Sequence, residues 1–345
     1  MLITEWQYFL LFVSSYAVVG LLTPVMRKFA IKREILDRPV AQHKTHSSPV
    51  PYLGGVAIII GIVFITYLGI FLSNFASSIF WLATSILVPA VAMGIVGLWD
   101  DIKSLRPFPR FIGQTLAGIV VTTLLIATEN IGMPTGSLIL DVFITIFWIV
   151  GICNSINFFD NLDGGAAGTI AISTTALTYL SISNDQLLIG ALSLVVSGST
   201  LGFLVWNRSP ARIYMGDAGA LFLGVLVATL SIRLKPNTET TFASFAIPIL
   251  LLAVPILDTT VAVISRIMRK VSPFQGGKDH LSHRLIRSGF SRKSSAILLW
   301  SMSAFFCFLA ILLTKLSSNY EIGIIFFATS LWVFLLIRFL QSSDS

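Results

Sequence analysis

The sequence is poor in charge. Only 11% of its 345 residues are Asp, Glu, Lys or Arg, while 55% are hydrophobic and the mean hydropathy is +0.87. A soluble domain carries about 25% charged residues, so this composition excludes a soluble globular protein and indicates a polytopic membrane protein. The length suits one bundle of spans, and we expect a single integral membrane domain over residues 1–345.

Cysteine and histidine are also scarce. The two cysteines, Cys153 and Cys307, both lie in apolar runs, which favours packing roles over a disulfide or a metal pair. His280 and His283 lie three residues apart, but without further His or Cys nearby they are a weak zinc signal. The apolar stretch 1–20 lacks a cleavage pattern of small residues, so we expect it to be retained as the first span.

Long apolar runs dominate the chain and predict an all-α membrane helix bundle. A helix needs about 20 apolar residues to cross a bilayer, and about eleven runs of this kind can be placed. An odd number of spans puts the two ends of the chain on opposite sides of the membrane. The predicted spans cover residues 6–26, 52–72, 79–99, 111–128, 138–155, 165–183, 187–206, 218–234, 241–264, 294–315 and 320–340.

Lys and Arg are distributed unevenly between the two sides. Cytoplasmic loops are enriched in these residues, so the basic side is predicted to be cytoplasmic and the N-terminus external. The net charge of +7 then reflects membrane orientation, and we expect no nucleic acid partner. The predicted cytoplasmic loops are about 27–51, 100–110, 156–164, 207–217 and 265–293; together with the cytoplasmic C-terminal end they hold 20 of the 23 basic residues.

Asp100 and Asp101 are adjacent acids at the predicted cytoplasmic end of a span. The C-terminal end of a helix disfavours negative charge, and two neighbouring carboxylates repel each other. A bound cation or a cationic loop would relieve both costs, which indicates a catalytic or metal-binding role. The alternative is a solvated helix end.

Asn157, Asp160 and Asp163 follow the fifth span at intervals of three residues. On a helix this spacing places all three side chains roughly on one face. The alternative is a polar loop that caps the next helix, with Asp163 as the N-cap. That alternative accounts for Asp163 but not for an amide and a second acid on the same face.

Residues 207–219 read as a loop that leads into the eighth span. The start of a helix offers free N–H groups to anions, and Asp217 lies there with Arg208 nearby. Asp217 is either a plain N-cap or a metal ligand beside a phosphate. A hard cation such as Mg²⁺ prefers few carboxylates together with phosphate oxygens.

The largest cytoplasmic loop is basic and contains His280 and His283. The surrounding positive charge favours contact of the histidines with phosphate, whereas for Lys270, Arg292 and Lys293 we prefer contact with anionic lipid heads. Asp258 lies within the ninth span, and an intramembrane acid belongs by default to a functional site or a polar network.

Taken together, these motifs resemble the polyprenyl-phosphate N-acetylhexosamine-1-phosphate transferase family. Asn161, Ala220 and Ser282 depart from its usual pattern, which leaves the acids intact but bears on sugar choice. The matching residues, in chain order, are Lys44-x-His46 before Pro51-x-x-Gly54-Gly55; Asp100-Asp101 with Leu105, Arg110-Phe111 and Gln114; Asn157, Asp160 and Asp163-Gly164; Tyr214-Met215-Gly216-Asp217-x-Gly219; Pro255-x-x-Asp258 with Arg266; and Ser272-Pro273-Phe274 with Asp279-His280-x-x-His283.

The resemblance implies transfer of N-acetylhexosamine 1-phosphate, first of all GlcNAc-1-phosphate, from a UDP-sugar to undecaprenyl phosphate with release of UMP. It implies a multi-pass protein of the inner (plasma) membrane with its active site on the cytoplasmic face, Mg²⁺ or alternatively Mn²⁺ as cofactor, and a homodimer. The last loop is more similar to the branch that starts O-antigen, enterobacterial common antigen or teichoic acid synthesis. The alternative branch, phospho-MurNAc-pentapeptide transferase, has a run of adjacent histidines. A transporter, the rival from another class, would distribute its acids through the depth of the bundle.

The resemblance also implies roles for individual residues. Direct attack by the lipid phosphate and a covalent aspartyl intermediate both fit them, and we favour direct attack. The expected catalytic residues are Asp100, Asp101, His280 and His283, the expected metal ligands are Asn157 and Asp217, and the expected substrate-binding residues are Lys44, His46, Asp160, Asp163, Arg208, Tyr214 and Arg284.

Overall fold

The computed structural model describes residues 4–37, 49–73, 77–103, 107–127, 135–238, 240–273 and 277–342. In these ranges the chain forms thirteen helices and one two-stranded ribbon. Ten helices are long and apolar enough to span a membrane, and the count is eleven if the bent pair α9 and α10 is taken as one span. The prediction of a polytopic helical protein with about eleven spans is confirmed. The elements are α1 (Glu5–Lys32), β1 (Leu36–Asp37), β2 (Val50–Pro51), α2 (Gly54–Leu72), α3 (Ser77–Lys103), α4 (Pro107–Ala127), α5 (Leu138–Phe159), α6 (Gly165–Ile182), α7 (Leu187–Asn207), α8 (Gly216–Arg233), α9 (Thr241–Leu251), α10 (Ala253–Met268), α11 (Leu281–Arg287), α12 (Arg292–Leu313) and α13 (Ser318–Gln341).

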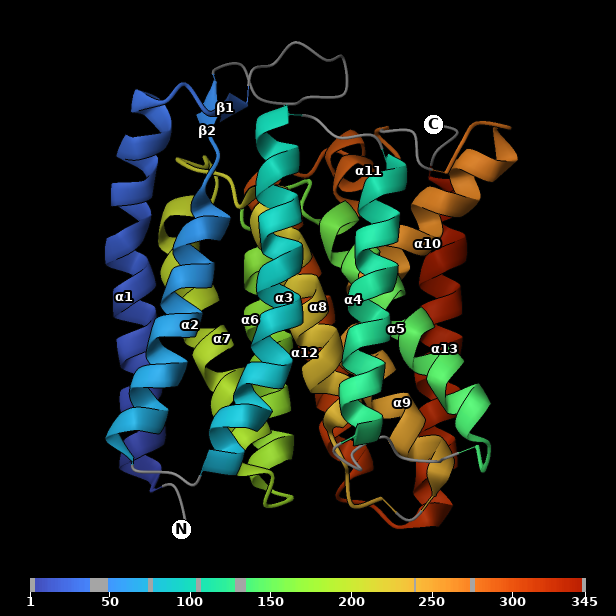
Figure 1. Ribbon diagram of the computed structural model, residues 1–345. Coiled ribbons are helices and arrows are strands. Elements are labelled where there is room, and N and C mark those ends of the chain that lie inside the picture. The colour runs from blue at the N-terminus through green and yellow to red at the C-terminus, as the bar shows by residue number, and fades with distance from the viewer. Residues whose placement is uncertain are drawn as a thin grey trace.

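The spanning helices stand side by side, and the ribbon and the short helix α11 lie at the same end of the bundle (Figure 1). That end carries the ribbon of β1 and β2, the C-terminal ends of α3 and α5, the start of α8, and α11. Helix α1 begins at one end of the bundle and α13 ends at the other, as an odd number of spans requires. Every acid that the sequence analysis singled out near a span end therefore lies at one end of the molecule.

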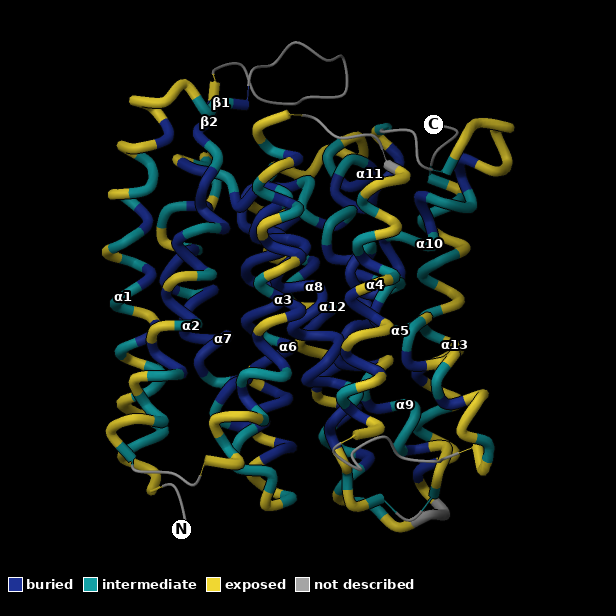
Figure 2. Tube along the Cα trace, viewed as in Figure 1, coloured by how far each residue is buried: buried dark blue, intermediate teal, exposed yellow. Residues whose placement is uncertain are grey.

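Helix α8 lies in the middle of the bundle (Figure 2). In the apolar segment of α8 that could span the membrane, 89% of the residues are buried. The corresponding share is 6% in α13 and 17% in α1. Helix α8 is rich in Gly, Ala and other small residues, which allow neighbouring helices to approach closely. Asp217, in its first turn, is therefore carried by the most enclosed helix of the fold.

Helix α2 meets the start of α8 through glycines. Gly54 and Gly55 donate their N–H groups to the carbonyl oxygens of Tyr214 (3.0 Å) and Met215 (2.8 Å). A Cβ at Gly55 would lie 2.1 Å from the backbone nitrogen of Gly219, so a side chain cannot fit there. The two glycine-containing motifs of the sequence are thus packed against each other.

The predicted span at 241–264 is broken. Helices α9 and α10 meet at Leu252 with a bend of 74°. Pro255 has no N–H to donate to the carbonyl of Leu251, and that carbonyl instead accepts from the Ser173 hydroxyl at 2.6 Å. Neighbouring side chains thus satisfy the backbone at the break, as a membrane interior requires.

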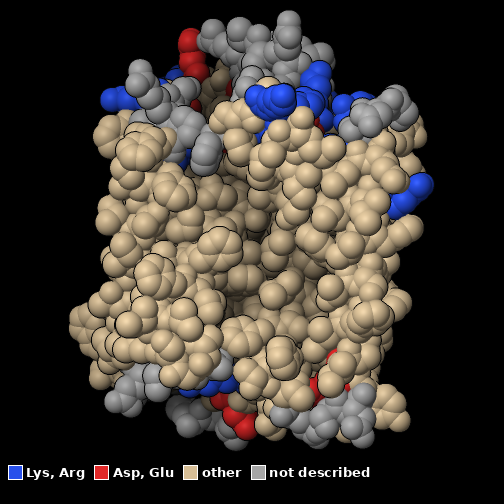
Figure 3. Space-filling view, turned by 90° about the vertical axis from the view of Figure 1, so that its right-hand side faces the viewer, with Lys and Arg blue, Asp and Glu red and all other residues tan. Residues whose placement is uncertain are grey.

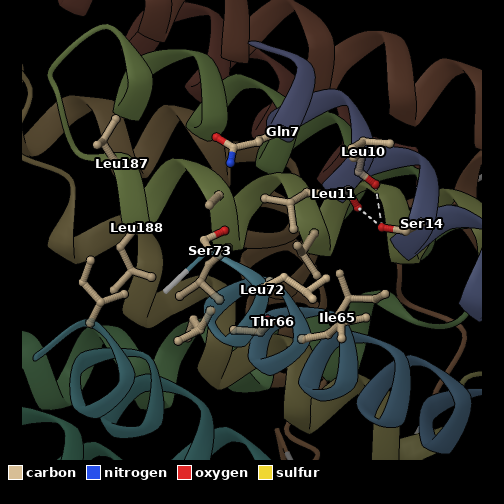
Figure 4. A pocket seen from close by; sticks show the side chains of 17 residues that line it. Gln7, Leu10, Leu11, Ser14, Ile65, Thr66, Leu72, Ser73, Leu187 and Leu188 are labelled. Carbon is tan, nitrogen blue, oxygen red and sulfur yellow. Dashed lines mark hydrogen bonds between the residues drawn. The ribbon is translucent and has the colours of Figure 1, made fainter. Parts of the chain in front are cut away.

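An apolar cavity of about 310 Å³ lies between α1, α2 and α7, close to the N-terminal end of α1 (Figure 4). Leucines such as Leu11 and Leu188 dominate its wall, and Gln7 and Ser73 supply polar groups. It lies toward the end of the bundle opposite α11, away from the acids. The apolar lining and this position separate the cavity from the candidate active site.

Candidate active site

The start of α8 is held by an acid from α3. Asp101 accepts hydrogen bonds from the backbone N–H groups of Asp217 (Oδ1, 2.8 Å) and Ala218 (Oδ2, 3.0 Å). The first N–H groups of a helix have no partner within the helix, and this carboxylate supplies one. Asp101 thus positions the start of α8, and its expected catalytic role stays a prediction.

Gly216 makes this cap sterically feasible. Its φ is +72°, a conformation that favours glycine. A Cβ at this position would also lie 2.5 Å from Asp101 Oδ2. Gly216 is therefore favoured both by the backbone turn and by the acid that caps the helix.

Asp217 receives side chains from two further helices. Its Oδ2 lies 2.8 Å from Arg110 Nη1 on α4, and its Oδ1 accepts from Asn157 Nδ2 on α5 at 2.7 Å. The same Arg110 nitrogen lies 2.7 Å from Asp100 Oδ2. Asp100 is 7% exposed, whereas Arg110 and Asp217 are 26% and 29% exposed. The predicted grouping of Asp100, Asp217 and Asn157 is thus observed as one contact cluster open on one side.

Arg110 did not figure among the predicted site residues. The sequence signal was its place in the loop region after the adjacent acids, where a basic residue can return to them. Its guanidinium lies between the carboxylates of Asp100 and Asp217. A cationic group from the next helix therefore offsets the negative charge of Asp100, as expected, but it pairs Asp100 with Asp217 rather than with its neighbour Asp101.

The chemistry of this cluster suits a hard cation. Two carboxylates and an amide are oxygen ligands of the kind that Mg²⁺ accepts. In the described part of the chain, no group of three or more His, Cys, Asp or Glu side chains lies together so that it could hold a metal ion. Mg²⁺ is commonly held by one or two carboxylates together with substrate phosphates and water, so Asp217, Asp100 and Asn157 fit the group.

Asn157, Asp160 and Asp163 do not share a helical face, and that prediction is wrong. Helix α5 ends at Phe159, and Asp160 is its C-cap. The side chain of Asn161 donates to the carbonyl of Phe158 at 2.6 Å, which satisfies an end carbonyl of the helix and stops it there. The predicted loop 156–164 therefore begins later, and only Asn157 projects from the helix.

Asp163 is buried in the turn between α5 and α6. It is 6% exposed, accepts from the Ala211 N–H at 3.2 Å, and lies 3.7 Å from Arg292. Gly164, not Asp163, is the N-cap of α6. Asp163 thus ties the turn to the loop after α7, which fits a structural role better than the predicted contact with nucleotide.

Asp160 differs from Asp163 in its electrostatics. Burial raises the pKa of Asp160 to about 7, and the negative charges of Asp217 and Asp163 add to the effect. A carboxyl with this pKa changes charge near neutral pH. It is the acid of this turn that can respond to a bound cation or an anionic ligand.

The loop after α7 carries two predicted substrate residues. Tyr214 is partly buried, and its ring lies 6.4 Å from that of Tyr52. Burial, and then the charge of Asp163, raises the pKa of Tyr214 above its ordinary value, so the phenol stays neutral. Arg208 is the exposed C-cap of α7. The remaining predicted substrate residues before α2, Lys44 and His46, lie outside the described residues.

The histidine segment is anchored to the broken span. Asp258, fully buried in α10, lies 2.7 Å from His280 Nδ1 and accepts from the Leu281 N–H at 2.7 Å. The other ring nitrogen, His280 Nε2, lies 3.2 Å from Arg266 Nη2. Asp258, which the sequence assigned to a functional site or a polar network, thus joins α10 to the start of α11.

Asp279 secures the same network from the loop side. It forms ion pairs with Arg266 at 3.1 Å and with Arg269. Burial alone would raise the pKa of Asp279, but these two arginines hold it below its ordinary value. Arg266 is therefore fixed between a charged carboxylate and His280.

His283 lies in a different environment from His280. Its ring is 5.9 Å from the His280 ring, and its Nδ1 has no partner within the described chain. Burial, and then the neighbouring His280, lowers the pKa of His283 to about 4. His283 is therefore neutral at physiological pH, and its Nδ1 is buried without a hydrogen-bond partner within the described chain.

Arg284 does not face the site. It is 1% exposed and donates to the carbonyl oxygens of Asp279 and Phe339 and to the hydroxyl of Ser265. These contacts point its guanidinium into the bundle, because a buried Arg needs partners for its donors. We therefore replace the predicted substrate-binding role of Arg284 by a structural one.

The end of α5 joins the acid cluster to the histidine segment. Phe158 packs its ring against the guanidinium of Arg266 (5.5 Å) and edge-to-face with His280 (6.1 Å). Ser282 donates to the side-chain oxygen of Asn161. Two of the positions that depart from the family pattern, Asn161 and Ser282, therefore contact each other.

Comparison with known proteins gives consistent matches over most of the chain. The sequence model of glycosyl transferase family 4 matches residues 83–235. The chain is 35% identical over 320 residues to a probable undecaprenyl-phosphate N-acetylglucosaminyl 1-phosphate transferase of Bacillus subtilis, covering 91% of this chain and 87% of that protein.

Two further relatives come from other bacteria. The decaprenyl-phosphate N-acetylglucosaminephosphotransferase of Mycobacterium leprae is 30% identical over 319 residues, with 82% of this chain and 80% of that protein covered. The phospho-N-acetylmuramoyl-pentapeptide-transferase of Staphylococcus carnosus is 26% identical over 310 residues, with 84% and 92% covered. Similarity is thus higher to the two relatives named for N-acetylglucosamine than to the pentapeptide transferase.

Proposed function

The chain belongs to glycosyl transferase family 4, and we propose that it transfers N-acetylglucosamine 1-phosphate from UDP-GlcNAc to undecaprenyl phosphate. UMP is the second product, and the reaction would begin the synthesis of a cell-envelope polysaccharide. The observation that carries the proposal is the convergence of Asp100, Asp217 and Asn157 from three helices on one open cluster with Arg110. The names of the similar proteins from Bacillus subtilis and Mycobacterium leprae support the donor sugar.

The reaction joins two anionic phosphates. An oxygen of the lipid phosphate attacks the sugar-bearing phosphorus of UDP-GlcNAc, a new O–P bond forms, and the bond to the UMP oxygen breaks. Phosphoryl transfer of this kind depends on charge neutralisation and on in-line positioning. Mg²⁺, held by Asp217 and Asn157 with Asp100 beside them, would supply the neutralisation when bound.

Protein groups complete the arrangement. Arg110 and Asp100 orient the lipid phosphate, because the guanidinium can exchange a carboxylate partner for a phosphate oxygen. Asp160 and the ring of Tyr214 face the nucleotide, and the neutral ring of His283 contacts a phosphate of the donor or of the leaving UMP. Direct attack needs no covalent enzyme intermediate, and we favour it for that reason.

The proposed site faces the cytoplasm. Lys and Arg side chains gather on the α11 end of the face seen in Figure 3, above a broad uncharged band. Basic residues mark the cytoplasmic side of a membrane protein, so the site would lie at the inner surface of the plasma membrane. Here it would meet soluble UDP-GlcNAc and the head of the lipid, and the family resemblance adds a homodimer.

A transfer assay tests the proposal. Purified protein with Mg²⁺, undecaprenyl phosphate and radiolabelled UDP-GlcNAc should yield a lipid-linked product, and Asp217→Ala should abolish it. Asp141→Asn, a buried acid at the far end of α5, is the matched control and should retain activity. If no lipid product formed with UDP-GlcNAc, UDP-GalNAc or a deoxy-amino UDP-sugar, the proposal would be overturned. Product with UDP-MurNAc-pentapeptide alone would assign the chain to the alternative branch.

A further inference from the structure

Asp258 and Arg266 contact opposite nitrogens of the same imidazole ring. His280 Nδ1 lies 2.7 Å from Asp258 Oδ2, and His280 Nε2 lies 3.2 Å from Arg266 Nη2. All three side chains are buried, with exposed fractions of 0%, 6% and 3% for the acid, the histidine and the arginine. Solvent therefore cannot replace either partner.

The donor chemistry of Arg266 decides which nitrogen of His280 carries the proton. A guanidinium only donates hydrogen bonds, so Nε2 must accept and cannot bear a hydrogen. In a neutral imidazole the proton then resides on Nδ1, from where it is donated to Asp258. The bonds run in one direction, from Arg266 through His280 to Asp258.

This polarity is incompatible with proton transfer at His280 Nε2. Protonation of that nitrogen would set an N–H against the Arg266 donors, and Arg266 is held in place by Asp279 at 3.1 Å and by the Pro273 carbonyl at 2.7 Å. The predicted catalytic role of His280 is therefore unsuited to this geometry. The ring is a connecting group between two fixed charges.

We propose that Asp258 is a positioning residue that holds His280 as the Nδ1–H tautomer and thereby fixes the start of α11 and the place of His283. Asp258 binds this segment twice, through the His280 ring and through the Leu281 N–H. His283 follows on the same short helix, with its ring 5.9 Å from that of His280. The inference rests on the proposed function in one respect only, namely that His283 meets a phosphate.

The substitution Asp258→Asn tests the polarity with almost no change of shape. The Leu281 N–H can only donate, so the amide oxygen of the new side chain must face it. The amide nitrogen, a donor, then faces His280 Nδ1. His280 must shift its proton to Nε2, where it meets the donors of Arg266. We expect kcat for GlcNAc-1-phosphate transfer to fall on the order of 10- to 100-fold.

A second substitution restores a continuous chain of hydrogen bonds, which then runs in the opposite direction. In Asp258→Asn with Arg266→Gln, the glutamine oxygen can accept from His280 Nε2–H. Arg266→Gln alone tolerates either tautomer but also loses the contacts with Asp279 and the Pro273 carbonyl, so it sets the reference for the double variant. The double variant should have a kcat close to that of Arg266→Gln alone, because Asp258→Asn no longer creates a clash of donors at His280. Losses in kcat that multiply in the double variant would overturn the proposal.

A spectroscopic measurement decides the point without substrate. NMR of detergent-solubilised protein labelled with ¹³C and ¹⁵N in its four histidines, with His280→Asn for assignment, reports which ring nitrogen carries the proton. We expect His280 as Nδ1–H in the natural protein and as Nε2–H in Asp258→Asn, with Asp141→Asn unchanged. An Nε2–H tautomer in the natural protein would overturn the proposal. Absence of transfer with all UDP-sugars would instead overturn the proposed function and leave this readout intact.

Discussion

Asp160 and Asp163 are alike in the sequence but differ in their surroundings. Asp163 is paired with backbone and with Arg292, whereas the pKa of Asp160 rises to about 7 from an ordinary value of 3.8. Burial is the larger cause and the charge of Asp217 the next. The two acids of one turn therefore differ in role, and Asp160 is the one whose protonation responds to charges in the site.

This raised pKa predicts a pH-dependent stability. Between about pH 4 and 7 folded Asp160 holds a proton that the unfolded chain has released, so its contribution to stability falls as pH rises through that window. Asp160→Asn removes this loss. The difference in Tm between the variant and the natural protein should therefore shift in favour of the variant as pH rises from 5 to 8. Thermal unfolding without ligand measures the difference, and a gap independent of pH would contradict the prediction.

Arg110 offers a second prediction for a single residue. Its Nη1 is shared by Asp100 and Asp217, and their repulsion is no longer offset in Arg110→Gln. We expect a loss of about 1.5–3 kcal/mol in stability without divalent cation, the range for charge-assisted hydrogen bonds. In unfolding experiments Mg²⁺ should restore much of the lost stability. Arg110→Lys should need less Mg²⁺ for the same stability. The same shift with and without Mg²⁺ would argue against a shared cation site.

Among the elements, α2 and α8 depend on close packing of backbones. Gly55 faces the nitrogen of Gly219, where an added Cβ would be 2.1 Å away, and Gly69 on the same helix faces only the end of Leu11 at 3.1 Å. A backbone cannot give way as a flexible side chain can. The position of Asp217 thus depends on a glycine contact that is remote from the acids in sequence.

Alanine substitutions at these two glycines should behave differently. Gly55→Ala should destabilise the protein by about 1–3 kcal/mol through overpacking and reduce transfer, because it displaces the start of α8. Gly69→Ala, the matched control, should be neutral or slightly stabilising, since alanine is the better helix former. Thermal unfolding and the transfer assay on both variants check this, and equal effects would exclude the packing explanation.

At the scale of the whole molecule, the acids of the candidate site lie on elements that meet at the α11 end of the bundle (Figure 1), and the face seen in Figure 3 carries most of its Lys and Arg side chains at that end. An exposed cysteine can report which side of the membrane this end faces. The native Cys153 and Cys307 are 0% and 3% exposed, so they give little background. Lys293 at the start of α12 and Asn237 between α8 and α9 are exposed at the opposite ends.

Labelling of intact cells follows from the charge distribution. A membrane-impermeant maleimide should label Asn237→Cys in intact cells and Lys293→Cys only after permeabilisation, because the basic end is expected to be cytoplasmic. A mass shift of the protein is sufficient to detect the labelling. The reverse pattern would place the proposed site outside the cell and contradict its access to UDP-GlcNAc.

Membrane class, number of spans and the gathering of acids at one end followed from the sequence alone. These properties depend on local hydropathy and on the parity of the spans, both of which are additive along the chain. The ends of the predicted spans agree with the helices to within a few residues at most positions; α1 runs to Lys32 and α3 to Lys103. The end of α5 at Phe159 differs from its predicted end at 155 as much as that of α3 differs from 99, and the feature that was not predicted is the bend at Leu252.

Only the tertiary structure decided which polar groups are paired. Asp100, Asp101 and Asp217 are alike by residue type, yet Asp101 caps α8 while the other two share Arg110. The two histidines also differ. His280 is fixed by Asp258 and Arg266, whereas Nδ1 of His283 has no hydrogen-bond partner within the described chain. Hydrogen bonding is directional and joins residues far apart in sequence, so spacing brings the groups to one place but does not assign their partners.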